Sequence, residues 1–269
     1  MKNCVIVSAA RTAIGSFNGA LATTSAIDLG ATVIKAALQR AQLDPQRVDE
    51  VIMGNVLQAG LGQNPARQAL LKSGLAETVC GFTVNKVCGS GLKSVALAAQ
   101  AILAGQAQAL VAGGMENMSQ APYLLDAKAR WGYRLGDGRL SDVILRDGLI
   151  CATHGYHMGI TAENVAKEYG ISRELQDAYA LSSQQKARAA IDAGRFKAEI
   201  VPVTTQRNGQ TVIIDTDEQI RQLGCHHGRV FLQMAAIGHS HTVSDRSPGN
   251  KFGLQLDRIK VCTEKTAHN

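Results

Sequence analysis

The chain has 269 residues, of which 45% are hydrophobic, 19% are charged and 4% are aromatic. This apolar content excludes a mainly disordered protein and is enough for one sizeable core or two small ones. The formal net charge is +6, but no basic run is interleaved with aromatic residues, so a nucleic-acid surface is disfavoured and a small anionic substrate fits equally well.

The sequence favours a cytoplasmic protein with no membrane partner. No apolar run reaches the ~18 residues that a membrane span needs, and the apolar N-terminal stretch is too short for a signal peptide. The cysteines are widely spaced and form no Cys-x-x-Cys pair, so reduced thiols are expected in this compartment. They are Cys4, Cys80, Cys88, Cys151, Cys225 and Cys262.

The first 115 residues alternate between strand-like and helix-like patterns. Short apolar runs predict strands at residues 4–9, 51–53, 82–87 and 109–112. Apolar residues at helical spacing predict helices at residues 26–43, 65–73 and 92–103. Strands that alternate with helices of this length predict βαβ units, and therefore an α/β fold with a largely parallel sheet.

The alternation stops near residue 120. A polar stretch is followed by predicted helices at residues 162–169 and 172–193, and by an Asn208-Gly209 pair that is typical of a β-hairpin turn. We interpret residues 120–220 as an inserted loop domain.

The remaining residues divide into two further parts. Residues 1–119 form the α/β unit on which the loop domain is built. Residues 221–269 hold five of the seven histidines and show no sustained helical or strand period, so they are interpreted as an atypical tail.

The segment that carries chemistry surrounds Cys88. A predicted strand ends at Val87, Gly89 and Gly91 allow a sharp turn and a close approach of substrate, and a helix follows. Cys88 is therefore expected at or just before a helix N-terminus, where unpaired amides and the helix dipole favour a thiolate. A thiolate beside free N–H donors suits acyl transfer, in which negative charge develops on a carbonyl oxygen. Spacing alone also allows Cys88 to be a small buried hydrophobe.

Other kinds of site have weaker support. The stretch Gly89–Ser94 ends in Ser where a dinucleotide fingerprint needs Gly or Ala, and it lacks the Gly-Lys pair of a P-loop, which disfavours a nucleotide-dependent oxidoreductase. Cys151, His154 and His157 are three residues apart, but structural zinc normally takes four ligands, so no metal is expected.

Glu116 and Asn117 follow the predicted strand at 109–112. Acid/base work is one interpretation of this pair, and a polar strand end that fixes a turn is the favoured one.

Several separated motifs resemble those of the thiolase family. The stretch Asn85–Gly91 resembles the nucleophile motif of that family. Further similar segments are Ser8–Gly15, Gly54–Arg67, Gly113–Ser119 and His157–Gly159. They follow the order of the family over about residues 1–220, with one small departure at Ala13, where the family usually has Pro.

The resemblance implies the N-terminal half of a layered, thiolase-like α/β fold and an acyltransferase activity. Cys88 would attack an acyl-CoA thioester and hold the acyl group. A second acetyl-CoA would lose an α-proton and add to that group, giving acetoacetyl-CoA and CoA, and the reverse reaction is thiolysis. His157 and Met158 match the family loop that borders the pantetheine arm and the acyl pocket, so they are expected to contact substrate.

The resemblance also implies a setting for this activity. The substrates are coenzyme A thioesters of fatty acid metabolism, and no separate cofactor is expected. The family commonly forms homotetramers, for which Ala121–Leu149 is the candidate contact.

Family motifs expected after about residue 220 are not found. They are an Asn-Glu-Ala-Phe segment, a Gly-His-Pro segment with the activating histidine and a Cys-x-Gly-Gly segment with the second cysteine; Gly238-His239-Ser240 differs from the second, and neither Cys225 nor Cys262 precedes a glycine pair. We therefore expect weak or absent thiolase activity. The alternative function is an inactive remnant, truncated or frameshifted, that at most binds CoA or associates with intact subunits.

Overall fold

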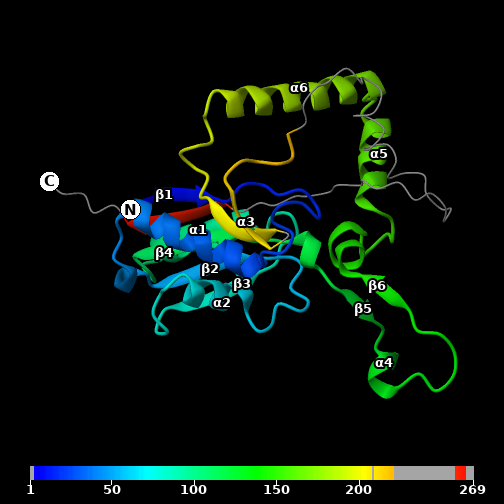
Figure 1. Cartoon of the computed structure of the whole chain (residues 1–269), viewed down its shortest axis with the longest axis horizontal. Coiled ribbons are helices and arrows are strands. Elements are labelled where there is room, and N and C mark those ends of the chain that lie inside the picture. The colour runs from blue at the N-terminus through cyan, green and yellow to red at the C-terminus, as the bar shows by residue number, and fades with distance from the viewer. Residues whose placement is uncertain (1–2, 208, 221–257, 265–269) are drawn as a thin grey trace.

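One five-stranded sheet organises the molecule (Figure 1). The computed structural model describes residues 3–207, 209–220 and 258–264. The strands lie in the order β1-β9-β4-β2-β3, and β2 pairs in parallel with both β3 and β4. Their bounds are β1 (Cys4–Arg11), β2 (Glu50–Gly54), β3 (Cys80–Val84), β4 (Ala109–Gly114) and β9 (Arg258–Glu264). The predicted α/β class is therefore confirmed.

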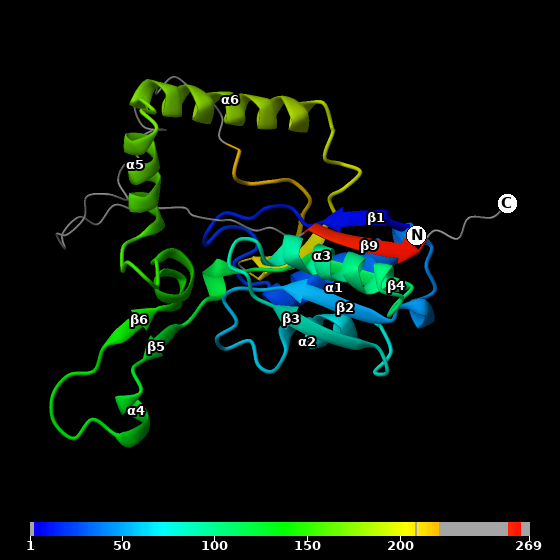
Figure 2. The same ribbon diagram turned by 180° about the vertical axis from the view of Figure 1, so that it is seen from behind.

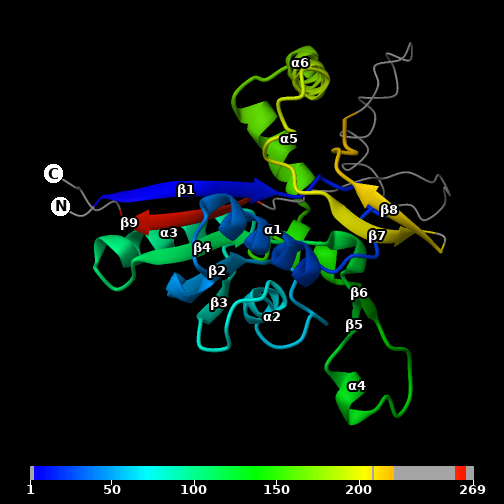
Figure 3. The same cartoon turned by 60° about the vertical axis from the view of Figure 1, so that its left-hand side comes forward.

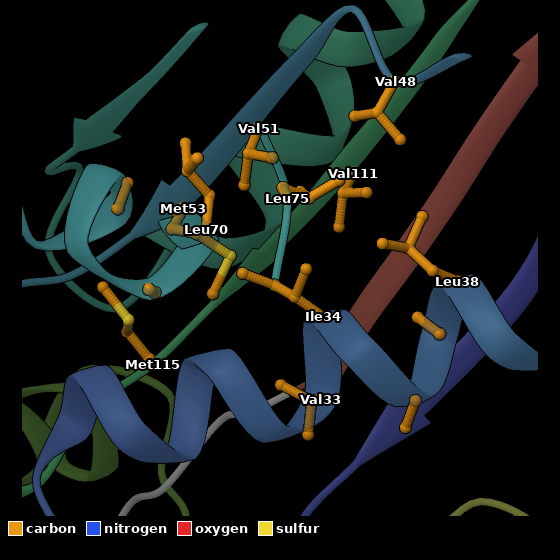
Figure 4. Close-up of a cluster of buried hydrophobic side chains, with 14 of the residues drawn as sticks. Val33, Ile34, Leu38, Val48, Val51, Met53, Leu70, Leu75, Val111 and Met115 are labelled. Atoms are coloured by element: carbon orange, nitrogen blue, oxygen red, sulfur yellow. The ribbon is translucent and has the colours of Figure 1, made fainter. Parts of the chain in front are cut away.

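Helices cover both faces of this sheet, because its central strands are apolar on both sides. In β2, Val51 and Met53 join a core cluster with α1 (Ala26–Ala41) and α2 (Pro65–Lys72), as Figure 4 shows. Ile52, between them, points into a second cluster with α3 (Ser90–Leu103). The three layers follow from the period-two alternation of side chains along a strand.

The predicted helix at 26–43 is confirmed, with a slightly earlier end. It begins because Ser25 caps it, accepting a hydrogen bond from the amide of Asp28 over 3.0 Å. It ends at Gln42, which adopts a left-handed conformation with φ +51°.

The strand predicted at 82–87 is present, but it ends three residues earlier than predicted. β3 stops at Val84, because the side chain of Asn85 accepts the amide of Val87 over 2.9 Å and turns the chain. The residues 85–89 between β3 and α3 therefore form a turn.

The region from residue 120 to residue 200 extends beyond the sheet (Figure 1). An arm contains β5 (Tyr123–Leu125), α4 (Lys128–Trp131) and β6 (Leu140–Asp142), and a π-helix (Ile144–Leu149) follows. Two helices come next, α5 (Met158–Glu168) and α6 (Arg173–Asp192). α5 begins four residues before the predicted position, because His157 caps it by accepting the amide of Gly159. Short 3₁₀ turns lie at Pro45–Arg47 and Met118–Gln120.

The predicted hairpin is confirmed as β7 (Val203–Arg207) and β8 (Gln210–Ile214), which pair antiparallel. Gly209 has the positive φ of +77° that a tight hairpin turn requires. Within the described residues, no helix is long and apolar enough to cross a membrane.

The atypical tail at 221–269 lies outside the described residues except for β9. The sequence showed no sustained strand period there, but residues 258–264 form a strand between β1 and β4, antiparallel to both (Figure 3). β1 pairs in the sheet only through β9 among the described strands.

Candidate active site

Cys88 lies at the exposed tip of the turn between β3 and α3. The turn is closed by Ser90, whose hydroxyl accepts the amide of Lys86 over 2.8 Å and donates to the carbonyl of Val87 over 2.6 Å. The amide of Gly89 donates to the Lys86 carbonyl over 3.1 Å. These bonds fix the backbone on both sides of Cys88 and leave its side chain exposed to solvent.

The residue before Cys88 is strained. Val87 has φ +48°, a left-handed conformation that is an outlier for a β-branched residue. Such strain costs about 1–3 kcal/mol and persists only where the surroundings hold it, which is common at functional sites. Here Asn85 and Ser90 hold it through the amide and the carbonyl of Val87.

The helix that follows Cys88 offers a site for negative charge. α3 has Gly89 at its N-cap and no side chain that caps it. The amides of Gly89 and Ser90 already donate to the carbonyls of Lys86 and Val87, over 3.1 Å and 3.0 Å. The helix dipole adds partial positive charge at this end, within the first turn of α3. Cys88 stands one residue before this N-cap, as the sequence predicted.

A close approach of backbones brings β2 against this turn. A Cβ atom on Gly54 would lie 2.5 Å from the amide nitrogen of Gly91, so only glycine fits at the end of β2. At Gly89 and Gly91 themselves, an added Cβ would make only ordinary contacts, at 3.4 Å and 3.7 Å. The sequence indicated a turn role for these two glycines and named Gly54 only within the thiolase-like segment Gly54–Arg67, because the contact of Gly54 is with a neighbour 37 positions away.

Glu116 fixes a turn, in agreement with the favoured interpretation of the sequence. Its Oε2 accepts the amide of Val56 over 2.8 Å, and its Oε1 accepts the amide of Leu57 over 3.2 Å and Asn55 Nδ2 over 3.0 Å. Burial raises the pKa of Glu116, and these hydrogen bonds offset only part of that effect. Asn55 is buried, and the sequence named it only within the segment Gly54–Arg67, without this contact.

Asn117 also fixes a turn. Its Nδ2 donates to the carbonyls of Leu21 and Thr24 over 3.1 Å and 2.6 Å, and its Oδ1 accepts the amide of Ser119 over 2.9 Å. All of its polar side-chain atoms are thus engaged with backbone groups, which leaves none for proton transfer.

His157 and Met158 lie at the start of α5. The Nδ1 atom of His157 accepts the amide of Gly159 over 2.9 Å, and the side chain of Met158 is exposed. Figure 2 shows that the carboxyl ends of β2 and β3 point toward the side on which this region lies. No direct contact joins either residue to Cys88 in the part of the chain that the structure describes.

The spaced residues Cys151, His154 and His157 do not converge. Cys151 Sγ lies 3.7 Å from His154 Nδ1, while His157 is occupied as the cap of α5. The described cysteines Cys4, Cys80, Cys88 and Cys151 are all free thiols. The tail histidines and Cys225 lie outside the described residues.

Comparison with known proteins gives one consistent result. A family model described as the thiolase N-terminal domain matches residues 4–225. Acetyl-CoA acetyltransferase of Escherichia coli is 81% identical over 218 residues, which are 81% of this chain and 55% of that protein. The proteins of the same name from Cupriavidus necator and Pseudomonas aeruginosa are 60% and 56% identical, each over 82% of this chain and 56% of their own length. The chain thus spans about half the length of these relatives.

Proposed function

The chain belongs to the thiolase family, and we propose that it transfers acyl groups between coenzyme A thioesters through Cys88. The Cys88 thiolate attacks the thioester carbonyl, a bond forms between Sγ and the acyl carbon, and the carbon–sulfur bond to CoA breaks. The CoA thiolate leaves and takes up a proton from solvent. One observation carries the proposal: Cys88 is the exposed residue directly before the uncapped N-terminus of α3, where the charge that develops on the carbonyl oxygen can be stabilised.

The names of the relatives support acetyl as the acyl group. On this proposal the α-carbon of acetyl-CoA loses a proton and forms a bond to the acyl carbon, the bond from that carbon to Sγ breaks, and acetoacetyl-CoA and the Cys88 thiolate are released. The reverse reaction cleaves acetoacetyl-CoA. We assign substrate contacts to His157 and Met158, and we assign no described residue to the removal of the α-proton. Turnover of the whole reaction is therefore a separate question from acylation of Cys88.

The segment Ala121–Leu149, which includes the arm at residues 123–142, is proposed as the contact with further copies of the chain. It exposes large apolar side chains, including Trp131 at 83% and Leu135 at 100%. Exposed apolar surface of this kind, gathered on a projecting arm, is typical of an interaction site.

Acylation can be tested directly. The folded chain is incubated with acetyl-CoA, digested and mapped by mass spectrometry for an acetyl thioester. We expect the label on Cys88, little on Cys80, which is also exposed, and none at position 88 in Cys88→Ser. Binding of CoA without any acylation of Cys88 would contradict the proposal and favour the alternative, a remnant that only binds CoA.

A further inference from the structure

We propose that Glu116 is a positioning residue for Cys88, acting through the turn that follows β2. The role rests on the proposed function of Cys88, which it deepens. Glu116 follows β4 and Cys88 follows β3, and β2 lies between these two strands in the sheet. The link between the two residues is made by Gly54, the last residue of β2, and by residues 55–57, which follow it.

The first link joins Glu116 to that turn. Its carboxylate accepts two consecutive backbone amides, those of Val56 and Leu57, and the side-chain amide of Asn55, over 2.8 to 3.2 Å. The backbone of residues 55–57 belongs to no helix or strand. It is held to the chain that follows β4 by these three donors and by a further hydrogen bond from Asn55 Nδ2 to the carbonyl of Met115 over 2.9 Å. Buried backbone amides that lose their acceptor cost about 1–3 kcal/mol each, so the turn is strongly tied to the carboxylate.

The second link joins the turn to the nucleophile. The amide of Asn55 donates to the carbonyl of Val84, the last residue of β3, over 3.1 Å. Asn85 Nδ2 donates to the carbonyl of Val56 over 3.4 Å. These bonds bring residues 55–56 into contact with the start of the Cys88 turn.

Gly54 supplies the contact at the other end of the Cys88 turn. It packs so closely on Ser90 and Gly91 that a Cβ would lie 2.5 Å from the Gly91 amide nitrogen. A shift of residues 54–57 would therefore move both ends of the Cys88 turn, and with them the sulfur relative to the N-terminus of α3.

The chemistry of the position favours a carboxylate. All three partners of Glu116 are N–H donors, and a carboxylate presents acceptors only. A glutamine in the same place would turn its NH₂ group toward at least one N–H donor. An aspartate keeps both acceptors and is one methylene shorter, so it can recover part of the arrangement.

The test measures the alkylation of Cys88 by iodoacetamide, peptide by peptide, in the full chain. Cys80, which is exposed at the other end of β3, is the internal reference, and Glu77→Gln, which removes the charge of an exposed side chain, is the matched control. In folded Glu116→Gln we expect the Cys88 rate to fall roughly fivefold or more while the Cys80 rate is unchanged. Glu116→Asp, which keeps both carboxylate oxygens, should recover part of this loss in the Cys88 rate.

An unchanged ratio of Cys88 to Cys80 rates in folded Glu116→Gln would overturn the proposal. If that variant does not fold, amide hydrogen exchange of the wild-type chain tests whether Glu116 holds the amides of residues 56 and 57. The amides of Val56 and Leu57 should exchange far more slowly than those of the exposed loop residues Gly62 and Gln63, and equal exchange would contradict the first link. Failure of the proposed function gives a different result, because Cys88 would then be alkylated no faster than Cys80 in the wild-type chain itself.

Discussion

Arg11 donates hydrogen bonds to both carboxylate oxygens of Asp217, over 2.7 and 2.9 Å, although 206 positions separate the two residues. Their side chains are only 6% and 7% exposed. Arg11 Nε also donates to Glu199 over 2.6 Å, and Asp217 accepts the amide of Ile14 over 2.8 Å. The end of β1 is thus tied to the chain that leaves β8.

Replacing Arg11 should be strongly destabilising. Arg11→Met leaves the Asp217 carboxylate buried without a cation, which costs about 3–5 kcal/mol of the free energy of unfolding. Lys72→Met is the comparison, because Lys72 pairs with Asp28 at a surface site where an ion pair is worth about 1 kcal/mol or less. Urea denaturation measures both losses, and equal losses would contradict this assignment.

The Asp28 pair should give a defined dependence of stability on pH. Partial burial acts to raise the pKa of Asp28, but hydrogen bonds from Lys72 and Ser25 outweigh it, so the pKa lies below the usual 3.8. A group with a lowered pKa in the folded state stabilises the protein above its unfolded pKa, and this contribution is lost as the pH falls through the folded value. The wild type should have a free energy of unfolding higher than that of Asp28→Asn by at most about 1 kcal/mol, because the pair lies near the surface. This difference should persist down to about pH 4 and vanish below it. A difference in the free energy of unfolding that grows on acidification would contradict a lowered pKa of Asp28 in the folded state.

Glycine at position 87 should cost little stability despite the loss of a side chain. Val87→Gly relieves a positive φ, which is worth about 1–3 kcal/mol, against about 1 kcal/mol for the added freedom of the unfolded chain. We expect a net change within about 1 kcal/mol in thermal unfolding. Val84→Gly, in the regular strand β3 next to the α3 core, should lose clearly more. Similar losses in both variants would argue against strain at Val87.

β9 should be needed for the sheet. Val261 pairs with Ser8 on one side and Val111 on the other, so Val261→Pro removes a ladder hydrogen bond inside the sheet. The loss should reach at least about 1–3 kcal/mol, whereas Val261→Ile, which keeps the N–H, should be nearly neutral. A proline variant as stable as the isoleucine variant would show that β9 contributes no stability.

Local patterns in the sequence account for what could be predicted. The strand and helix on either side of Cys88 follow from apolar periodicity, and the hairpin follows from one Asn-Gly pair. The turn itself depends on Asn85, Ser90 and the positive φ of Val87 rather than on the two glycines that suggested it. Glu116 and the turn at Asn55–Leu57 are about 60 positions apart, and Arg11 and Asp217 lie 206 apart. Contacts at such separations depend on the order of strands in the sheet, which local periodicity does not specify.

The direct test of the central claim compares two exposed thiols of one molecule. Cys88 and Cys80 are both free and exposed, but only Cys88 stands before the N-terminus of α3. Peptide mapping after brief exposure to iodoacetamide at neutral pH should show Cys88 modified roughly tenfold faster than Cys80, because the thiolate is the reactive form. Equal rates at the two positions would contradict an activated nucleophile.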